Sequence, residues 1–167
     1  MVQTAHIDDE HAAVDVLVAT VSDRLVAFRL GDVEQVLPAA AVAELPHAPA
    51  VVRGLLNLRG APLPVIDLRV RLGLEGRAAH PDDHVLVCQV GGRSVGVWVD
   101  HAAAVRRLER TVVVPFDDGM PARHFAGAAM VGDGVLLVSD VDSFLSAAET
   151  LELERALSEV AKDRRGV

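Results

Sequence analysis

The stretch VRGLLNLRGAPLPVIDL (residues 52–68) carries the clearest architectural signal, because it recurs in weaker form as FAGAAMVGDGVLLVSDV (125–141). Gly54 and Gly127 lie 73 positions apart, and the same offset relates Asp67 to Asp140. Upstream, RLVAFRL (24–30) overlays RSVGVWV (93–99) at an offset of 69. Self-similarity at a near-constant spacing indicates one supersecondary unit that the chain uses twice.

Both copies of this unit are rich in short, β-branched runs with turn signals about every ten residues. Ser22-Asp23 and Gly91-Gly92 separate such runs as hairpin turns do. Many short strands of this kind are typical of barrels or a sandwich, and not of a parallel sheet. The sequence therefore predicts a mainly β fold with two small, similar barrels side by side, the first over about residues 14–68 and the second over about 84–141. Barrels this small bury little surface alone, so a shared hydrophobic seam is expected.

The repeated residues have predicted structural roles. Asp67 and Asp140 stand where a strand ends and a short helical segment begins, and a carboxylate there can cap the free N–H groups of the first turn. We favour this role over a catalytic one. Gly54 and Gly127 begin the repeated hairpins.

The chain closes with a predicted helix over residues 147–163. Ser146 and Glu149 have the spacing of a capping box. Leu153, Leu157 and Val160 then recur on one helical face. We expect this apolar stripe to pack on the barrels (residues 13–146) in preference to a partner, and residues 1–12 to form a mobile tail.

The composition excludes several classes of function. The 167 residues carry 16 basic and 24 acidic side chains, a net charge of −8, which disfavours nucleic acid as a partner. The chain lacks an apolar run long enough for membrane insertion, and its first residues do not resemble a signal peptide. A cytoplasmic protein is expected.

No motif in the sequence points to an enzyme. Cys88 lies in an apolar strand, where a thiol is inert, and neither a GxSxG motif nor a glycine-rich phosphate loop is present. His80 and His84 have the spacing of a metal pair, but Pro81 lies between them and disfavours the helix that such a pair needs. We expect no catalytic residue, no cofactor and no metal.

Asn57 and Arg59 are the polar residues of an otherwise apolar run. In an extended strand they would face away from Leu56 and Leu58. An arginine on a rigid element can form forked hydrogen bonds with carboxylates or carbonyls of a partner. Alternatively, Arg59 could tie the two barrels together internally. The sequence leaves both roles open.

These residues resemble the CheW family of chemotaxis adaptors along nearly the whole chain. The resemblance rests on RLVAFRLGDVEQVLP (24–38), PAVVRGLLNLRGAPLPVIDLRVRLGL (49–74), SVGVWVD (94–100) and GAAMVGDGVLLVSDVDSFL (127–145), followed by the terminal helix. It implies two five-stranded SH3-like barrels. It also implies a non-catalytic adaptor that joins the cytoplasmic tips of chemoreceptors to the regulatory domain of the histidine kinase CheA, at receptor arrays on the inner membrane.

The resemblance also implies partner-binding residues. Asn57, Arg59 and Gly60 match the family's NLRG motif, whose arginine is tied to receptor coupling. The resemblance implies that the receptor hairpin lies in a groove between the two barrels, and Val33 and Val36 match apolar positions beside this groove and the kinase contacts. Relatives often carry a glutamate where this chain has Gln35, with Glu34 adjacent, and loop 38–49 departs from the family without an assigned role. Two alternatives are a CheW-like coupler of a non-flagellar system and a regulatory module of a larger kinase or receiver-fused adaptor.

Overall fold

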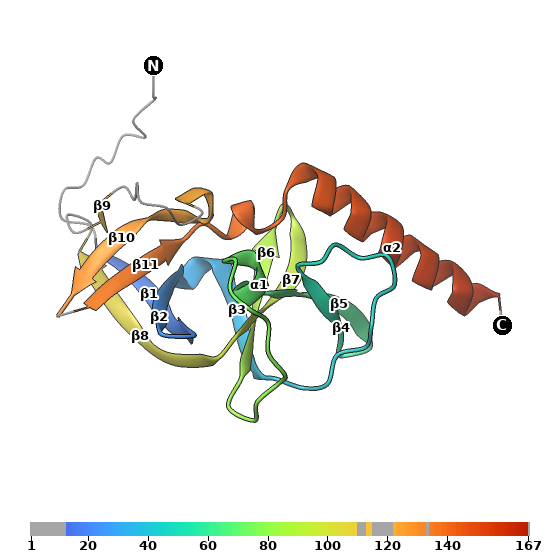
Figure 1. Cartoon of the computed structure of the whole chain (residues 1–167), viewed down its shortest axis with the longest axis horizontal. Coiled ribbons are helices and arrows are strands. Elements are labelled where there is room, and N and C mark those ends of the chain that lie inside the picture. The colour runs from blue at the N-terminus through green and yellow to red at the C-terminus, as the bar shows by residue number, and fades with distance from the viewer. Residues whose placement is uncertain (1–12, 110–112, 115–121, 133, 167) are drawn as a thin grey trace, which may run out of the picture.

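A computed structural model of the protein describes residues 13–109, 113–114, 122–132 and 134–166, so the expected tail over residues 1–12 lies outside the described residues. Two sheets lie side by side, and a long helix extends from them (Figure 1). The first sheet has the order β8-β1-β2-β11-β10-β9 and consists of β8 (His101–Glu109), β1 (Ala13–Val21), β2 (Arg24–Arg29), β11 (Gly134–Ser139), β10 (Phe125–Val131) and β9 (Val113–Val114). The second has the order β3-β6-β7-β5-β4 and consists of β3 (Val33–Pro38), β6 (His84–Val90), β7 (Arg93–Val99), β5 (Ala61–Asp67) and β4 (Val52–Leu58).

Short helical segments connect these strands. They are the 3-10 helices η1 (Leu30–Asp32), η3 (Ala122–His124) and η4 (Val141–Phe144), and the single turn α1 (Leu68–Arg71). The terminal helix α2 spans Ala147–Arg165. The predicted mainly β class with two similar sheets is confirmed, and the first sheet has a sixth strand, β9, of only two residues.

The predicted barrel boundaries, 14–68 and 84–141, are wrong. Each sheet combines a hairpin of one repeat with a hairpin of the other: β1–β2 joins β10–β11, and β4–β5 joins β6–β7. The junctions are the parallel pairs β2–β11 and β5–β7. Similarity between two halves cannot reveal this exchange, because the same hairpins could pair within a repeat or between repeats.

The register shows that the repeat itself is real. Val138 on β11 faces Ala27 on β2, and Val65 on β5 faces Gly96 on β7, which are the same pairs at the offsets of 73 and 69. Both hairpins also shift register just before their repeated glycine, so that Gly54 pairs with Val65 and Gly127 with Val138. The two sheets are therefore equivalent strand by strand, with the hairpins exchanged.

Gly54 has a second structural task. Its φ of +152° is unfavourable for other residues, and a Cβ there would lie 2.4 Å from the carbonyl oxygen of Ala43. Ala43 and Leu55 exchange two backbone hydrogen bonds at 2.7 and 2.8 Å. The glycine thus lets loop 38–49 lie directly on β4.

The two repeated aspartates differ in what they do. The Asp67 carboxylate accepts hydrogen bonds from the N–H groups of Arg69 (3.0 Å) and Val70 (3.5 Å), so it caps α1 as predicted. The predicted cap by Asp140 is wrong: its side chain accepts no capping hydrogen bond at η4. Instead, Ser143 donates from both its backbone and its hydroxyl to the Asp140 carbonyl oxygen, which already satisfies this turn.

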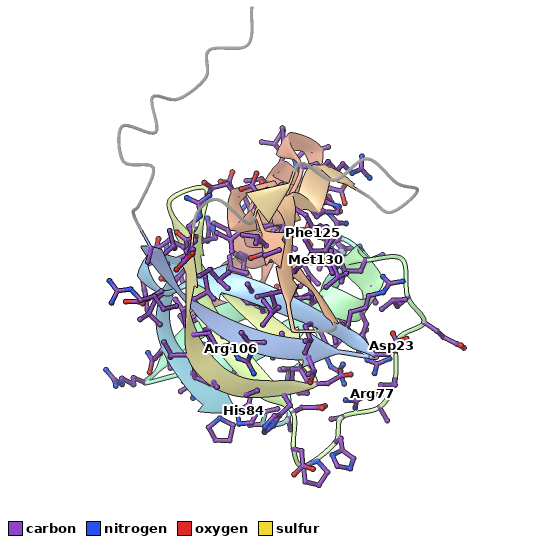
Figure 2. The ribbon with its side chains drawn as sticks, turned by 90° about the vertical axis from the view of Figure 1, so that its left-hand side faces the viewer. Asp23, Arg77, His84, Arg106, Phe125 and Met130 are labelled. Atoms are coloured by element: carbon purple, nitrogen blue, oxygen red, sulfur yellow. The ribbon has the colours of Figure 1, made fainter. Side chains whose placement is uncertain are left out.

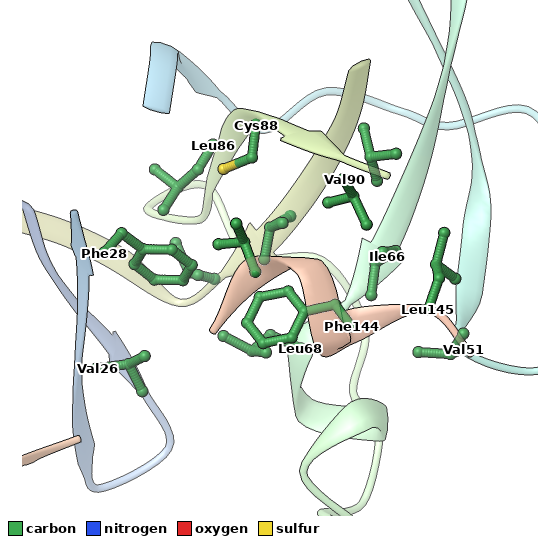
Figure 3. Packing of buried hydrophobic residues seen from close by; sticks show 14 of the residues in the cluster. Val26, Phe28, Val51, Ile66, Leu68, Leu86, Cys88, Val90, Phe144 and Leu145 are labelled. Atoms are coloured by element: carbon green, nitrogen blue, oxygen red, sulfur yellow. The ribbon is translucent and has the colours of Figure 1, made fainter. Parts of the chain in front are cut away.

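The expected seam between the sheets is the largest apolar cluster. Val26 and Phe28 reach it from the first sheet, while Leu86 and Val97 reach it from the second. Phe144 of η4 is fully buried among them, with its ring edge-on to Phe28 at a centroid distance of 6.3 Å (Figure 3). Two smaller clusters each belong to one sheet alone. The sheets are thus joined through a continuous core.

Helix α2 packs on this core through its first half. The Ser146 hydroxyl accepts from the Glu149 N–H and the Glu149 carboxylate accepts from the Ser146 N–H, so the predicted capping box is present. Leu153 is fully buried, but the stripe is narrower than predicted, since Leu157 and Val160 are only half-buried. The helix approaches the sheets at an angle, and its last turns extend past them (Figure 1).

Candidate partner-binding site

The hairpin of β4 and β5 contains the three predicted residues of the NLRG motif, Asn57, Arg59 and Gly60. Leu58 pairs with Ala61, which leaves Arg59 and Gly60 as a two-residue loop. Both have positive φ, +53° and +84°, as a type I′ turn requires. The Asn57 side-chain oxygen accepts a hydrogen bond from the Gly60 N–H at 2.8 Å. Asn57 and Gly60 therefore fix the turn that presents Arg59.

The expectation of Arg59 as a strand residue is wrong, because it sits in the turn. Its side chain is exposed and forms no ion pair or hydrogen bond with any residue that the structure describes. No contact among the described residues supports the alternative that Arg59 ties the two barrels together. The guanidinium is left available to a partner.

Arg53, six residues earlier, is the internal arginine that sequence reasoning missed. It forms an ion pair with Asp67 at 3.1 Å, donates to the Arg77 carbonyl and lies 4.0 Å over the Trp98 ring. The repeat contained a signal: Ala126 stands at the position equivalent to Arg53, which explains why Asp140 has no such partner.

The second predicted group, Val33 to Val36, lies on β3. This strand pairs only with β6 among the described strands, so one edge of its backbone is free. Val33 and Gln35 are half-buried, whereas Val36 is 41% exposed. The Glu34 carboxylate accepts a hydrogen bond from Gln89. An edge strand with an exposed valine can bind a partner through both backbone and apolar contacts.

The structure does not merge the two groups into one site. β3 and β4 occupy opposite ends of the strand order β3-β6-β7-β5-β4, and loop 38–49 spans the distance between them. The protein therefore offers two separate surfaces on the second sheet: the β4–β5 turn and the β3 edge.

A network of ion pairs, formed by Asp83 and Asp100 with Arg69 and Arg77, stabilises this sheet. The Asp83 carboxylate, almost fully buried, binds the Arg77 guanidinium through two hydrogen bonds and accepts from the Trp98 indole N–H at 3.0 Å. Asp100 joins Arg77 to Arg69, and it also accepts from the Ser22 N–H in the β1–β2 turn of the other sheet. Figure 2 labels Arg77 and Asp23 at this edge.

The network holds its carboxylates ionised. Burial alone would raise the pKa of Asp83, but hydrogen bonds from Arg77, the His80 N–H and Trp98 outweigh it and set the pKa below its usual value. Asp100 behaves in the same way, because hydrogen bonds from Arg69 and Ser22 outweigh the effect of burial on its pKa. The sequence analysis did not identify this network, since Trp98, Arg69 and Ser22 lie 15, 31 and 78 positions from the aspartates that they contact.

Two other groups link stability to pH. The hydrogen bonds from Arg71 lower the pKa of Glu149 from 4.5 to about 2. Burial, with help from the charges of Arg71 and Arg123, lowers the pKa of His124 below its ordinary 6.5. In both cases the unfolded chain binds the proton more readily than the folded chain, so acid favours unfolding.

We expect the free energy of unfolding to be highest above pH ~7. It should fall first below about pH 6.5, where His124 of the unfolded chain becomes protonated, and more steeply below about 4.5, as Glu149 follows. Urea unfolding at pH 7.5, 5.5 and 3.5 measures this. Glu149→Gln keeps the capping-box geometry and should make the decline below pH ~4.5 shallower, whereas Glu152→Gln on the exposed face should not. An unchanged slope in Glu149→Gln would contradict the assignment.

The histidines do not gather into a metal site. His84 accepts a hydrogen bond from the Ala102 N–H and its ring stands edge-on to His101, while His80 accepts from the Asp82 N–H. No three His, Cys, Asp or Glu side chains are arranged to hold a metal ion in the described ranges.

Burial raises the pKa of the Cys88 thiol to about 12, so it stays protonated. Among the described helices, none is long and apolar enough to cross a membrane.

Comparison with known proteins places residues 15–149 within a family model described as the CheW-like domain. The chemotaxis protein CheW of Rhizobium meliloti (strain 1021) is 33% identical over 137 residues, covering 75% of this chain and 88% of that protein. The probable chemotaxis protein CheW of Rhizobium etli is 35% identical over 138 residues, covering 75% and 89%. The crystal structure of the scaffolding protein TtCheW from Thermoanaerobacter tengcongensis matches with a TM-score of 0.76 at 21% identity, covering 83% of this chain and 91% of that one.

Proposed function

The chain belongs to the CheW family of chemotaxis scaffold proteins, and from this premise we propose that it is a non-catalytic adaptor that couples the cytoplasmic tips of chemoreceptors to the histidine kinase CheA. The observation that carries the proposal is the exposed Arg59 guanidinium on a turn fixed by the Asn57–Gly60 hydrogen bond. Because this turn is already ordered, binding there costs little conformational entropy.

The receptor is the proposed partner of the β4–β5 turn. An arginine presents five donors in a planar fork, which suits a carboxylate or a set of backbone carbonyls at the end of a helical hairpin. The regulatory domain of the kinase is the proposed partner of the β3 edge, where Val36 is exposed beside Val33, Glu34 and Gln35. The adaptor would thus work in the cytoplasm, at receptor arrays on the inner membrane.

Arg59→Ala tests the receptor half of the proposal. Loss of charge-assisted hydrogen bonds worth about 1.5–3 kcal/mol should weaken binding of a receptor cytoplasmic hairpin fragment roughly 10- to 100-fold. Binding of the CheA regulatory domain should change less than about threefold, because the β3 edge is untouched. Calorimetric titration of both fragments measures the two affinities. Arg155→Ala on the exposed face of α2 removes the same charge and serves as the control.

A melting curve of the Arg59→Ala protein completes the test. The melting temperature should stay within about 2 °C of the wild type, because Arg59 has no partner in the described structure. An unchanged receptor affinity in a stably folded variant would overturn the assignment. Equal loss of receptor and kinase binding, together with a lower melting temperature, would restore the reading of Arg59 as an internal tie.

A further inference from the structure

The β4–β5 turn borders a small cleft of about 200 Å³. Residues from loop 38–49, the hairpin and the end of α2 line it: Ala41, Ala43, Leu55, Leu56, Asn57, Gly60, Pro62 and Arg164. Apart from Asn57 and Arg164, this lining is apolar. The Asn57 side-chain oxygen accepts from the Gly60 N–H, and the charged residue among those that line the cleft is Arg164.

Arg164 reaches the cleft on a helix that is anchored at its other end. The capping box, the Arg71–Glu149 ion pair at 2.7 Å and the buried Leu153 fix the first turns of α2. A continuous helix transmits that orientation to its last turn, from which Arg164 lines the cleft together with Asn57 and Gly60. Like Arg59, Arg164 is exposed and pairs with no acid that the structure describes.

These two arginines differ from the others that support the second sheet. Arg53, Arg69, Arg71 and Arg77 each bind a partly or fully buried carboxylate of this chain. Other surface arginines among the described residues also form no ion pair, but Arg164 lines the apolar cleft and Arg59 directly precedes Gly60, which lines it too. Unpaired cations around an apolar cleft complement a segment that carries both carboxylates and an apolar side chain.

We propose that Arg164 is a second binding residue of the receptor site, forming with Arg59 and the cleft a composite surface for an acidic segment. The partner's apolar side chain enters the cleft, and carboxylates beside it pair with the two guanidiniums. This inference rests on the proposed function and specifies the chemistry of the receptor tip. The C-terminal turn of α2 would thus contact the receptor through Arg164.

Charge reversal at the helix end tests the proposal. Arg164→Glu should weaken binding of the receptor hairpin fragment at least about 10-fold. Arg165→Glu makes the same charge change one residue along, outside the cleft lining, and should alter affinity less than about threefold. Both variants should melt like the wild type, since both side chains are exposed. The measurements are made on the full chain at one salt concentration.

A second variant tests the cleft itself. Ala41 is exposed in loop 38–49 and lines the cleft, so Ala41→Phe should fill it without disturbing the core. Receptor affinity should fall about 10-fold, while binding of the CheA regulatory domain stays constant. Replacing an acidic residue of the receptor segment by lysine should restore part of the affinity lost in Arg164→Glu.

The outcomes separate this inference from the proposed function. If Arg59→Ala weakens receptor binding but Arg164→Glu and Arg165→Glu behave alike, the composite site is wrong and the adaptor role stands. If Ala41→Phe binds the receptor fragment like the wild type, the cleft is not occupied and the composite site is likewise overturned. If the wild-type chain binds no receptor fragment, the proposed function fails and this inference falls with it.

Discussion

Replacing Asp83 by alanine is expected to lower the free energy of unfolding by about 3–5 kcal/mol, the range for removing one partner of a buried ion pair. The carboxylate holds Arg77 and satisfies the buried indole N–H of Trp98, so its loss leaves the indole without its partner and Arg77 with one carboxylate fewer. Asp100 still contacts Arg77, which keeps the loss within this range. For a chain of this length, the melting temperature should fall by about 6–20 °C.

Asp82 provides the matched control for this prediction. It precedes Asp83 directly but is exposed, and its ion-pair contact is a long one of 3.7 Å to His80. Asp82→Ala should change stability by less than about 0.5 kcal/mol. Chemical unfolding of both variants at pH 7 distinguishes them. Equal stabilities for the two variants would mean that the ionic network contributes nothing to the folded state.

Leu153→Ala is expected to cost about 2–5 kcal/mol, because a fully buried leucine is replaced and a cavity remains in the seam. The leucine contacts the core shared by both sheets, and its loss should also loosen the helix that carries Arg164. Thermal and urea unfolding measure the stability. Receptor binding, if the composite site is correct, should weaken as well.

The same helix offers two internal comparisons. Leu157 is half-buried, so Leu157→Ala should lower the free energy of unfolding less than Leu153→Ala does. Leu151 is 54% exposed, so Leu151→Ala should leave the free energy of unfolding nearly unchanged. This graded order depends on the helix lying on the sheets through one narrow stripe. If all three variants have the stability of the wild type, α2 does not pack on the core, and its last turn cannot be held at the cleft.

The shared seam has a consequence for the adaptor role. Both proposed surfaces lie on the second sheet, while its ionic network and Phe144 connect that sheet to the first. Because packed cores transmit displacement with little compression, the β4–β5 turn and the β3 edge keep a fixed relative position.

Features set by neighbouring residues were predictable from the sequence. The capping box of Ser146 and Glu149, the Gly91-Gly92 hairpin and the Asp67 cap all depend on contacts within a few positions, so residue type and spacing suffice. The repeat was equally visible, since equivalent strands need the same pattern of apolar residues and glycines. These local signals determined the mainly β class, the doubled unit and the terminal helix.

Long-range pairing decided what the sequence left open. Which hairpins share a sheet depends on two parallel pairs, β2–β11 between residues 111 positions apart and β5–β7 between residues 31 apart, and the two repeats offer nearly equal partners for either choice. The surroundings of the arginines were decided in the same way: Arg53 contacts Asp67 and Trp98, whereas Arg59 lies exposed in the turn between β4 and β5. Asp140 does not form its expected cap, because Ser143 bonds the turn instead. The sequence determines the chemistry of each side chain, whereas the tertiary structure determines which distant residue that side chain contacts.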